Sequence, residues 1–241
     1  EPQVSLAMEN SRLLKEIFFF LKERLPENEL GHVLNIMKKN FANEEHVDEI
    51  MGVIYKSLTR GLSITQQIME YSRIGHEKIQ GKPIHMDQLI QDQVGQYRPE
   101  FNTWGIEFVL NLTAENTCIM GQETHFTSIF DNLILNARDA LLDESLAGGN
   151  QRKIAISSNH DGRYYQVNIL DNGVGISQED LDKIFDPFFT TKEVGKGSGL
   201  GLAMVYGIVQ NSRGYVYVDS DKGKGTVFDL FFRVAKDKER Q

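Results

Sequence analysis

The sequence is poor in cysteine and in long apolar runs, and each shortage excludes a class of protein. Its single cysteine, Cys118, cannot form an intramolecular disulfide, and without a CxxC pair it gives no sign of a zinc site. We therefore expect a reducing, cytoplasmic location. The longest apolar run, Ile17–Leu21, is far shorter than the ~20 residues that cross a bilayer, so no membrane segment is expected. The N-terminal residues also lack the basic start of a secretory signal peptide.

Positive charge is scarce as well. The chain has 26 Lys and Arg against 34 Asp and Glu, for a net charge of −8, which argues against a broad nucleic-acid-binding surface. A hydrophobic content of 40% provides enough apolar surface for a core and excludes disorder as the main state. The length of 241 residues suits one large domain or two small ones.

Glycine divides the sequence into two parts. It is sparse before Gly75 and becomes frequent from residue 81 onward, where short β-rich runs also begin. We therefore expect a helical domain over residues 1–80 and a second domain over residues 81–241.

The first part predicts two long amphipathic helices. Apolar residues recur at helical spacing along residues 14–41 and 47–69. Pro26 predicts a kink or restart in the first stretch, and Asn43 is a suitable cap for the second helix. The result is an antiparallel helical hairpin, whose wide apolar stripe favours dimerisation into a four-helix bundle. The alternative is a hairpin that packs on the second domain of its own chain.

The second part alternates between helical and extended patterns, so the whole chain is predicted as α+β, a hairpin followed by an α/β sandwich. We expect a mixed sheet with helices on one face. The expected helices are Met86–Tyr97, Gln122–Leu142 and Gly201–Arg213, and the expected strands are Ile106–Leu112, Ile154–Ser158, Tyr164–Leu170, Tyr215–Asp219 and Thr226–Phe232. A turn over residues 159–162 is expected between two of these strands.

Short amide and acidic side chains share one face of an expected helix. Asn132, Asn136 and Asp139 lie at positions i, i+4 and i+7. Such a face can hold a hard cation through oxygen and still leave room for phosphates. Solvated or capping asparagines are the ordinary alternative.

A second polar segment, Asp171–Ile176, comes directly after an expected strand. Gly173 and Gly175 would let the backbone approach a flat ligand closely. The carboxylate of Asp171 could accept a hydrogen bond from an exocyclic amine. An ordinary turn at a strand end is the alternative.

Two further segments follow. Ile184–Lys192 is rich in aromatics and predicts a movable flap with a hydrophobic hinge, or else a loop that fills the core. Gly195–Leu202 precedes a helix, whose exposed N–H groups suit a phosphate chain, and Lys192 and Lys196 add positive charge. Glycine-rich flexibility alone is the alternative. The pattern is neither a Walker A loop nor a dinucleotide fingerprint.

In their order and spacing these segments resemble the GHKL ATPase and kinase superfamily, and within it the catalytic domain of sensor histidine kinases. Asn132–Ala140 resembles the N box, Asp171–Ile176 the G1 box, Phe185–Phe189 the F box and Gly197–Leu202 the G2 box, while Gly225-Thr226 resembles the last glycine motif. The resemblance covers about residues 82–234. It implies the Bergerat type of ATP-binding fold, with ATP and Mg²⁺ as cofactors, and places a dimerisation and histidine-phosphotransfer domain in the preceding hairpin.

The resemblance also implies roles for particular residues. Asn136 would ligate the metal, with Asn132 supporting it or contacting phosphate. Asp171 would read the adenine amino group, and Thr226 would share that hydrogen-bond network. Gly173 and Gly175 would shape the adenine pocket, while Gly197, Gly199, Leu200 and Gly201 would cover the phosphates as part of a lid. The charge of Lys192 adds our own expectation of a phosphate contact.

The reaction type follows from Asn132. In hydrolysing branches of the superfamily, as the resemblance implies, a glutamate at this place activates water, and an amide cannot act as a base. Transfer of the γ-phosphoryl group of Mg-ATP to a histidine, and then to a response-regulator aspartate, fits better than hydrolysis. The implied partners are a second copy of the chain and a response-regulator receiver domain. Because a helix is under way by about Leu6, we also expect a sensor domain upstream of this chain.

The phosphoacceptor is the weakest part of the match. The family's H box has a helical histidine followed by an acid, with a proline about five residues on, and this chain has no such pattern. His32 is the best candidate, although Val33 follows it and Glu29, one turn earlier, would have to replace the acid. Alternatively, His32 is an ordinary helix histidine. The chain would then be a dimeric, ATP-binding regulatory pseudokinase, or a GHKL kinase that acts on a partner protein.

Overall fold

The computed structural model describes residues 61, 65, 67–69, 81–114, 117–143, 145, 151–192 and 197–235. It divides the chain into two units, residues 1–66 and 67–241, and all elements below belong to the second unit. The predicted hairpin, its dimer and His32 lie outside the described residues. The boundary near residue 80 also stays a prediction.

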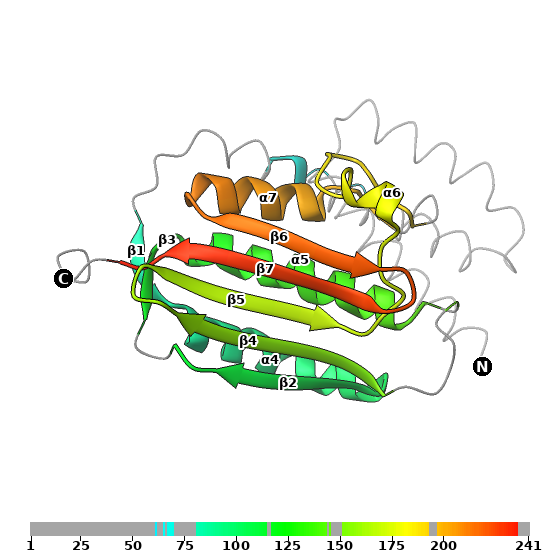
Figure 1. Cartoon of the computed structure of the whole chain (residues 1–241), viewed down its shortest axis with the longest axis horizontal. Coiled ribbons are helices and arrows are strands. Elements are labelled where there is room, and N and C mark those ends of the chain that lie inside the picture. Colours follow the sequence, from blue (N-terminus) through cyan, green and yellow to red (C-terminus); the bar gives the residue numbers. More distant parts are fainter. Residues whose placement is uncertain are drawn as a thin grey trace, which may run out of the picture. The chain divides into compact units, whose positions relative to one another are not determined.

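A mixed sheet forms one layer of the second unit (Figure 1). Its strands run in the order β2-β4-β5-β7-β6. The parallel pair is β2 with β4, and the other neighbouring pairs are antiparallel. The bounds are Ile106–Leu112 for β2, Arg152–His160 for β4, Tyr164–Asp171 for β5, Tyr215–Asp221 for β6 and Gly225–Arg233 for β7. The predicted mixed sheet is confirmed.

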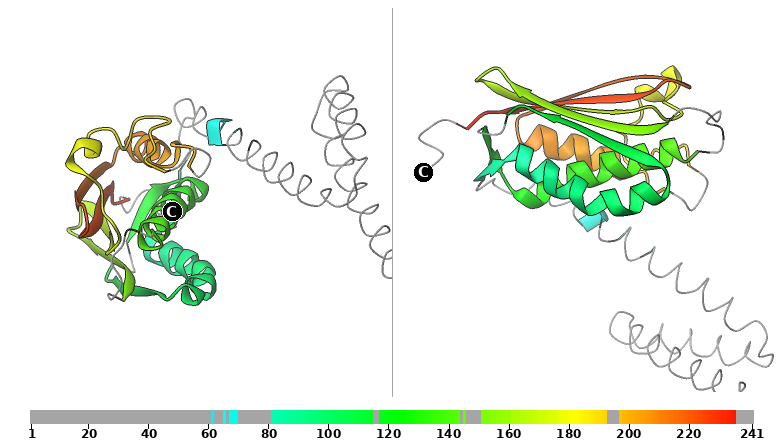
Figure 2. Two further views of the ribbon diagram at one scale, coloured as in Figure 1. Left: turned by 90° about the vertical axis from the view of Figure 1, so that its right-hand side faces the viewer. Right: turned by 90° about the horizontal axis from the view of Figure 1, so that it is seen from below.

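Helices cover one face of this sheet, as expected (Figure 2). They are α4 (Met86–Thr103), α5 (Glu123–Leu141) and α7 (Gly201–Asn211), and a short helix, α6 (Gln178–Leu181), lies near β6. The central helix is α5, because it packs against both α4 and α7.

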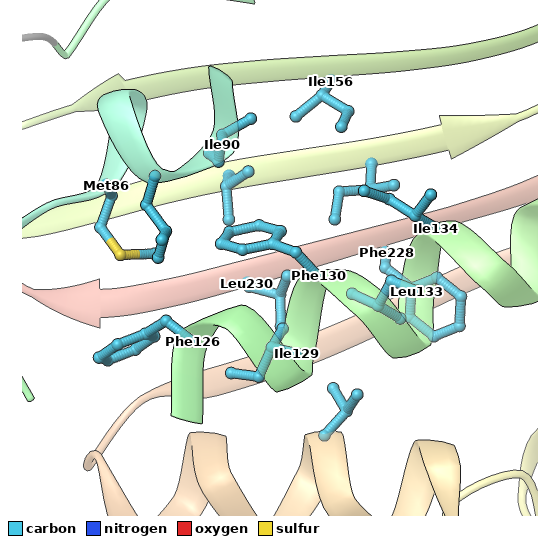
Figure 3. Close-up of a cluster of buried hydrophobic side chains, with 14 of the residues drawn as sticks. Met86, Ile90, Phe126, Ile129, Phe130, Leu133, Ile134, Ile156, Phe228 and Leu230 are labelled. Carbon is cyan, nitrogen blue, oxygen red and sulfur yellow. The ribbon is translucent and has the colours of Figure 1, made fainter. Parts of the chain in front are cut away.

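The core lies between α5 and the sheet. Apolar residues of α5 fall at helical spacing, so one stripe turns inward, and Phe130 and Leu133 are almost fully buried. They lie with strand residues such as Ile156 and Leu230 (Figure 3). Along β5, buried and partly exposed residues alternate from Tyr164 to Asp171, as expected for a sheet with one covered face. The opposite face of α5 is thereby left free to carry polar side chains.

Long-range contacts account for the elements that the sequence did not reveal. The short strands β1 (Lys82–His85) and β3 (Cys118–Gly121) form a separate antiparallel pair. Each has only four residues, and their pairing joins segments far apart in the chain. A bridge between Ile119 and Val234 links this pair to the end of β7.

Several predicted bounds were too short. Helix α4 continues past Pro99 to Thr103, because Phe101 is fully buried against Trp104 and Phe108. Strand β4 includes His160, so the turn begins later than expected. The strand β2 has the predicted bounds. Among the described residues, no helix is both long and apolar enough to cross a membrane.

Candidate nucleotide site

The polar face of α5 carries the first group of site residues. Asn132, Asn136 and Asp139 are all partly buried, and the apolar stripe of the same helix fixes their direction. Asn132 donates from Nδ2 to the carbonyl of Ser128 at 2.8 Å. Its Oδ1 lies beside Gly201, since a Cβ on that glycine would come within 2.5 Å of it. Asn132 therefore lies where α5 meets the first residue of α7.

The buried carboxylate of Asp171 lies at the end of β5. It accepts hydrogen bonds from the backbone N–H groups of Gly173, at 2.8 Å, and Thr226. Thr226 is its cross-strand neighbour on β7. Burial raises the pKa of Asp171 from 3.8 to about 6, and the two backbone donors oppose the shift. At neutral pH this side chain is thus a buried, ionised acceptor.

Ser220 completes the network around Asp171, and no pattern in the sequence pointed to it. Its hydroxyl is buried and donates to the carbonyl of Gly225 at 2.8 Å, while it accepts from the backbone N–H of Ile176 at 2.8 Å. The hydroxyl of Thr226 lies 3.1 Å away. Ser220 therefore ties the 171–176 segment to the strands β6 and β7.

The 171–176 segment leans directly on the end of α5. The backbone N–H of Val174 donates to the carbonyl of Ala140 at 3.1 Å, and Gly173 packs against the same residue. Gly175 has a φ of +66°, and a Cβ there would lie 2.1 Å from the carbonyl oxygen of Asp221. Only glycine fits such a backbone.

The residues after α6 cover another part of α5. Lys192 donates from Nζ to Oδ1 of Asn136 at 3.3 Å and forms an ion pair with Oδ2 of Asp139 at 2.5 Å. Gly197 lies next to Lys192 and to Thr190. Residues 193–196 lie outside the described part of the chain. The described ends of this stretch nevertheless meet the polar face of α5 at Lys192 and Gly201.

Phe188 and Gly199 join the two halves of this stretch. The N–H of Phe188 donates to the carbonyl of Gly199 at 2.8 Å. Gly199 has a φ of +68°, and a Cβ there would clash with the backbone of Phe188 at 2.4 Å. Phe188 itself has a φ of +69° and a side chain that is 64% exposed, an unusual state for a bulky residue. The predicted aromatic segment is thus divided: Ile184 lies in the core, whereas Phe188 faces solvent.

Leu200 lies differently from the glycines around it. Its side chain is buried, so any ligand contact would come from its backbone. Its N–H donates to Oγ of Ser198 at 3.3 Å, directly before the first turn of α7.

Two further sets of contacts on α5 were also missed from the sequence. Arg138 donates from Nε and Nη2 to Oδ1 of Asp139, at 2.8 and 2.5 Å, and its guanidinium lies over the ring of Trp104 at 5.8 Å. Tyr97, on α4, donates from its hydroxyl to Asp131 at 2.9 Å. The contacts of Trp104 and Tyr97 form only when α4 packs on α5, so the local sequence could not reveal them.

The described residues hold no group of three or more His, Cys, Asp or Glu that could bind a metal ion. Oxygen atoms of Asn136 and Asp139 do, however, both accept hydrogen bonds from the ammonium group of Lys192. Asn136 therefore fits a hard cation that takes its other ligands from phosphates and water.

Comparisons with known proteins agree with this geometry. Residues 121–236 match the family described as histidine kinase-, DNA gyrase B-, and HSP90-like ATPase. The chain is 29% identical to the sensor kinase CckA of Brucella abortus over 204 residues. This matched region makes up 81% of this chain but only 21% of that protein. The chain thus spans about a fifth of this relative's length.

Solved structures show the same fold. Full-length ShkA in complex with AMPPNP matches with a TM-score of 0.67 and 20% identity, over 83% of this chain and 41% of that one. The histidine kinase ThkA in complex with the response regulator protein TrrA matches with a TM-score of 0.62 and 22% identity, over 97% of this chain and 64% of that one.

Proposed function

Because residues 121–236 form a histidine kinase-type ATPase core of the family shared with DNA gyrase B and HSP90, we propose that the chain is the ATP-binding kinase core of a sensor histidine kinase. One observation carries the proposal. The segments around Asn136, Asp171, Phe188 and Gly201, far apart in the sequence, all meet α5 or each other. A single nucleotide could contact all of them.

The adenine would lie at Asp171. Its carboxylate is fixed by two backbone donors and is ionised at neutral pH, so it can accept a hydrogen bond from the exocyclic amine. The network of Ser220 and Thr226 would hold that carboxylate in place. Gly173 and Gly175 would bring backbone rather than side chain against the base.

The phosphates would extend along α5 towards α7. The first-turn N–H groups of α7 have no partner within the helix and lie at its positive dipole end, and Lys192 adds a full charge. Gly197, Gly199 and Gly201 would let the lid backbone approach the phosphates. Asn136 would hold Mg²⁺, which would supply positive charge to neutralise the negative charge that develops on the phosphates.

In the proposed reaction an imidazole nitrogen attacks the γ-phosphorus, the bond to the bridging oxygen breaks, and ADP leaves. A response-regulator aspartate then takes the phosphoryl group from the phosphohistidine. The protein's contribution is positioning and charge neutralisation, because the chemistry needs little else. The amide of Asn132 offers no base for water, which favours transfer over hydrolysis. We propose His32 as the acceptor, dimerisation through the hairpin, and a receiver domain as partner.

Labelling with γ-³²P ATP tests this proposal. The chain should take up an acid-labile, base-stable label, and His32→Ala should abolish it. The matched control is His160→Ala, which removes a histidine at the exposed end of β4 and should leave labelling unchanged. A label that survives in His32→Ala would move the acceptor to another residue.

The sequence around His32 also supports a second candidate, because the acid that should follow the acceptor is missing. The chain would then bind ATP without labelling itself. ATP binding by calorimetry with no label on the chain would select the regulatory pseudokinase, whereas a label on an added partner protein would select a kinase that acts on that partner.

A further inference from the structure

Two oxygen atoms of α5 converge on one positive charge. Lys192 Nζ lies 3.3 Å from Oδ1 of Asn136 and 2.5 Å from Oδ2 of Asp139. These two residues are three positions apart on the same helix, so their side chains lie side by side. The ammonium therefore occupies a place where oxygen ligands already point inward.

Hydrogen bonds from Arg138 hold the carboxylate of Asp139 in this orientation. Both hydrogen bonds from Arg138 end on Oδ1, and the guanidinium also lies over the ring of Trp104 at 5.8 Å. Oδ2 is therefore the atom turned towards Asn136 and Lys192. An ordinary solvent-exposed acid would have no such fixed direction.

From this arrangement we infer that Asp139 supplies a second oxygen of the divalent-cation site, next to Asn136, and that Lys192 holds the cation's place until metal and nucleotide arrive. This inference rests on the proposed function and deepens it. Hard cations such as Mg²⁺ favour one carboxylate together with neutral oxygens, phosphates and water. Asn136 alone gives the site no negative charge, and Asp139 supplies it.

The same arrangement assigns two successive tasks to Lys192. An ammonium and a divalent cation repel each other, so the metal must displace Lys192 from Asn136 and Asp139. The released ammonium then lies beside the incoming triphosphate, to which it can donate. Metal binding and the phosphate contact are thus coupled through one side chain.

The test compares nucleotide affinity with and without metal. Calorimetry on the full chain gives the Kd for AMPPNP in EDTA and in excess Mg²⁺, and the Kd in EDTA divided by the Kd in Mg²⁺ measures what the metal contributes. Asp139→Asn should lower this ratio about tenfold or more, in the range found when groups that support a metal site are lost. Lys192→Met should raise the ratio, because it removes the competing cation.

Glu123→Gln is the matched control. It removes one negative charge from the exposed first turn of the same helix, about 24 Å from Asp139 along the helix axis, and should leave the ratio unchanged. The signal of free Mn²⁺ in electron paramagnetic resonance gives a second readout. In Asp139→Asn, a lower concentration of EDTA than in the wild type should release Mn²⁺ from the nucleotide complex.

The outcomes separate two failures. A ratio and a Mn²⁺ affinity that are both unchanged in Asp139→Asn would overturn the role of Asp139 and leave the kinase proposal intact. A wild-type chain that binds no AMPPNP under either condition would overturn the proposed function and this inference with it. Urea unfolding of each variant, followed by Trp104 fluorescence, checks that folding is intact.

Discussion

The replacement Asp171→Asn should strengthen the fold while removing the proposed adenine contact. Burial raises the pKa of Asp171 from 3.8 to about 6. Such a shift means that keeping the side chain ionised in the folded protein costs about 3 kcal/mol at neutral pH. Asparagine has nearly the same shape and keeps an oxygen for the N–H of Gly173. We therefore expect a gain of about 1–3 kcal/mol in the free energy of unfolding at pH 7.5. The gain falls short of the full ionisation cost because the neutral amide accepts weaker hydrogen bonds than the carboxylate.

The sign of the pH dependence follows from the raised pKa. The folded state binds a proton at Asp171 more tightly than the unfolded state, so the wild type is favoured at low pH. Its advantage is full below about pH 3.8 and is lost as the pH rises through about 6. The difference in unfolding free energy between Asp171→Asn and the wild type should therefore grow between pH 4 and 7, then level off.

Urea unfolding followed by tryptophan fluorescence can measure this difference. Trp104 is the single tryptophan of the chain and packs against Phe101 in the α/β domain, so its signal reports this domain alone. Calorimetry with AMPPNP should show at least a tenfold loss of affinity in Asp171→Asn, because an amide donor would face the adenine amine. A stability difference that stays flat from pH 4 to 7.5 would refute the reasoning about burial.

Other substitutions test the remaining parts of the site. Gly175→Ala should destabilise the domain by about 2 kcal/mol or more, visible as a lower urea midpoint, because its φ of +66° and the nearby carbonyl of Asp221 exclude a Cβ. Ser220→Ala should cost about 1–3 kcal/mol and lower the Tm, since the N–H of Ile176 loses its acceptor and the buried hydroxyl network around Thr226 is lost. Lys192→Ala should change the free energy of unfolding by less than about 1 kcal/mol, since its ion pair is partly exposed, but should weaken AMPPNP binding. An unchanged urea midpoint in Gly175→Ala, an unchanged Tm in Ser220→Ala, or unchanged AMPPNP binding in Lys192→Ala would contradict the corresponding role.

The periodicity of the sequence was sufficient to predict the elements that have one apolar side. The inward stripe of α5 and the alternation along β5 both come from a covered and an open face, and both elements were expected from the sequence, as the helix Gln122–Leu142 and the strand Tyr164–Leu170. Asn132, Asn136 and Asp139 were placed on a common helix face by the same argument. The glycines of the 171–176 segment could be found because backbone approach demands them.

Contacts that join distant segments could not be predicted from residue spacing. The helix was expected to end at Tyr97, yet the burial of Phe101 carries α4 past Pro99 to Thr103. Nothing in the local sequence distinguishes Ser220 from other serines, because its contacts with Ile176 and Thr226 form only when β6 pairs with β7. The short strands β1 and β3 acquire their hydrogen bonds only from each other.

The sequence by itself determined which residue types the site could use and which helix face would carry the amides, since side-chain period and backbone freedom are local properties. Tertiary structure alone decided that Lys192 lies on Asn136 and Asp139, that Arg138 turns one carboxylate oxygen towards them, and that Asp171 is buried enough to titrate near pH 6. These properties arise from distances between segments and from exclusion of water, and both exist only once the helices have packed on the sheet.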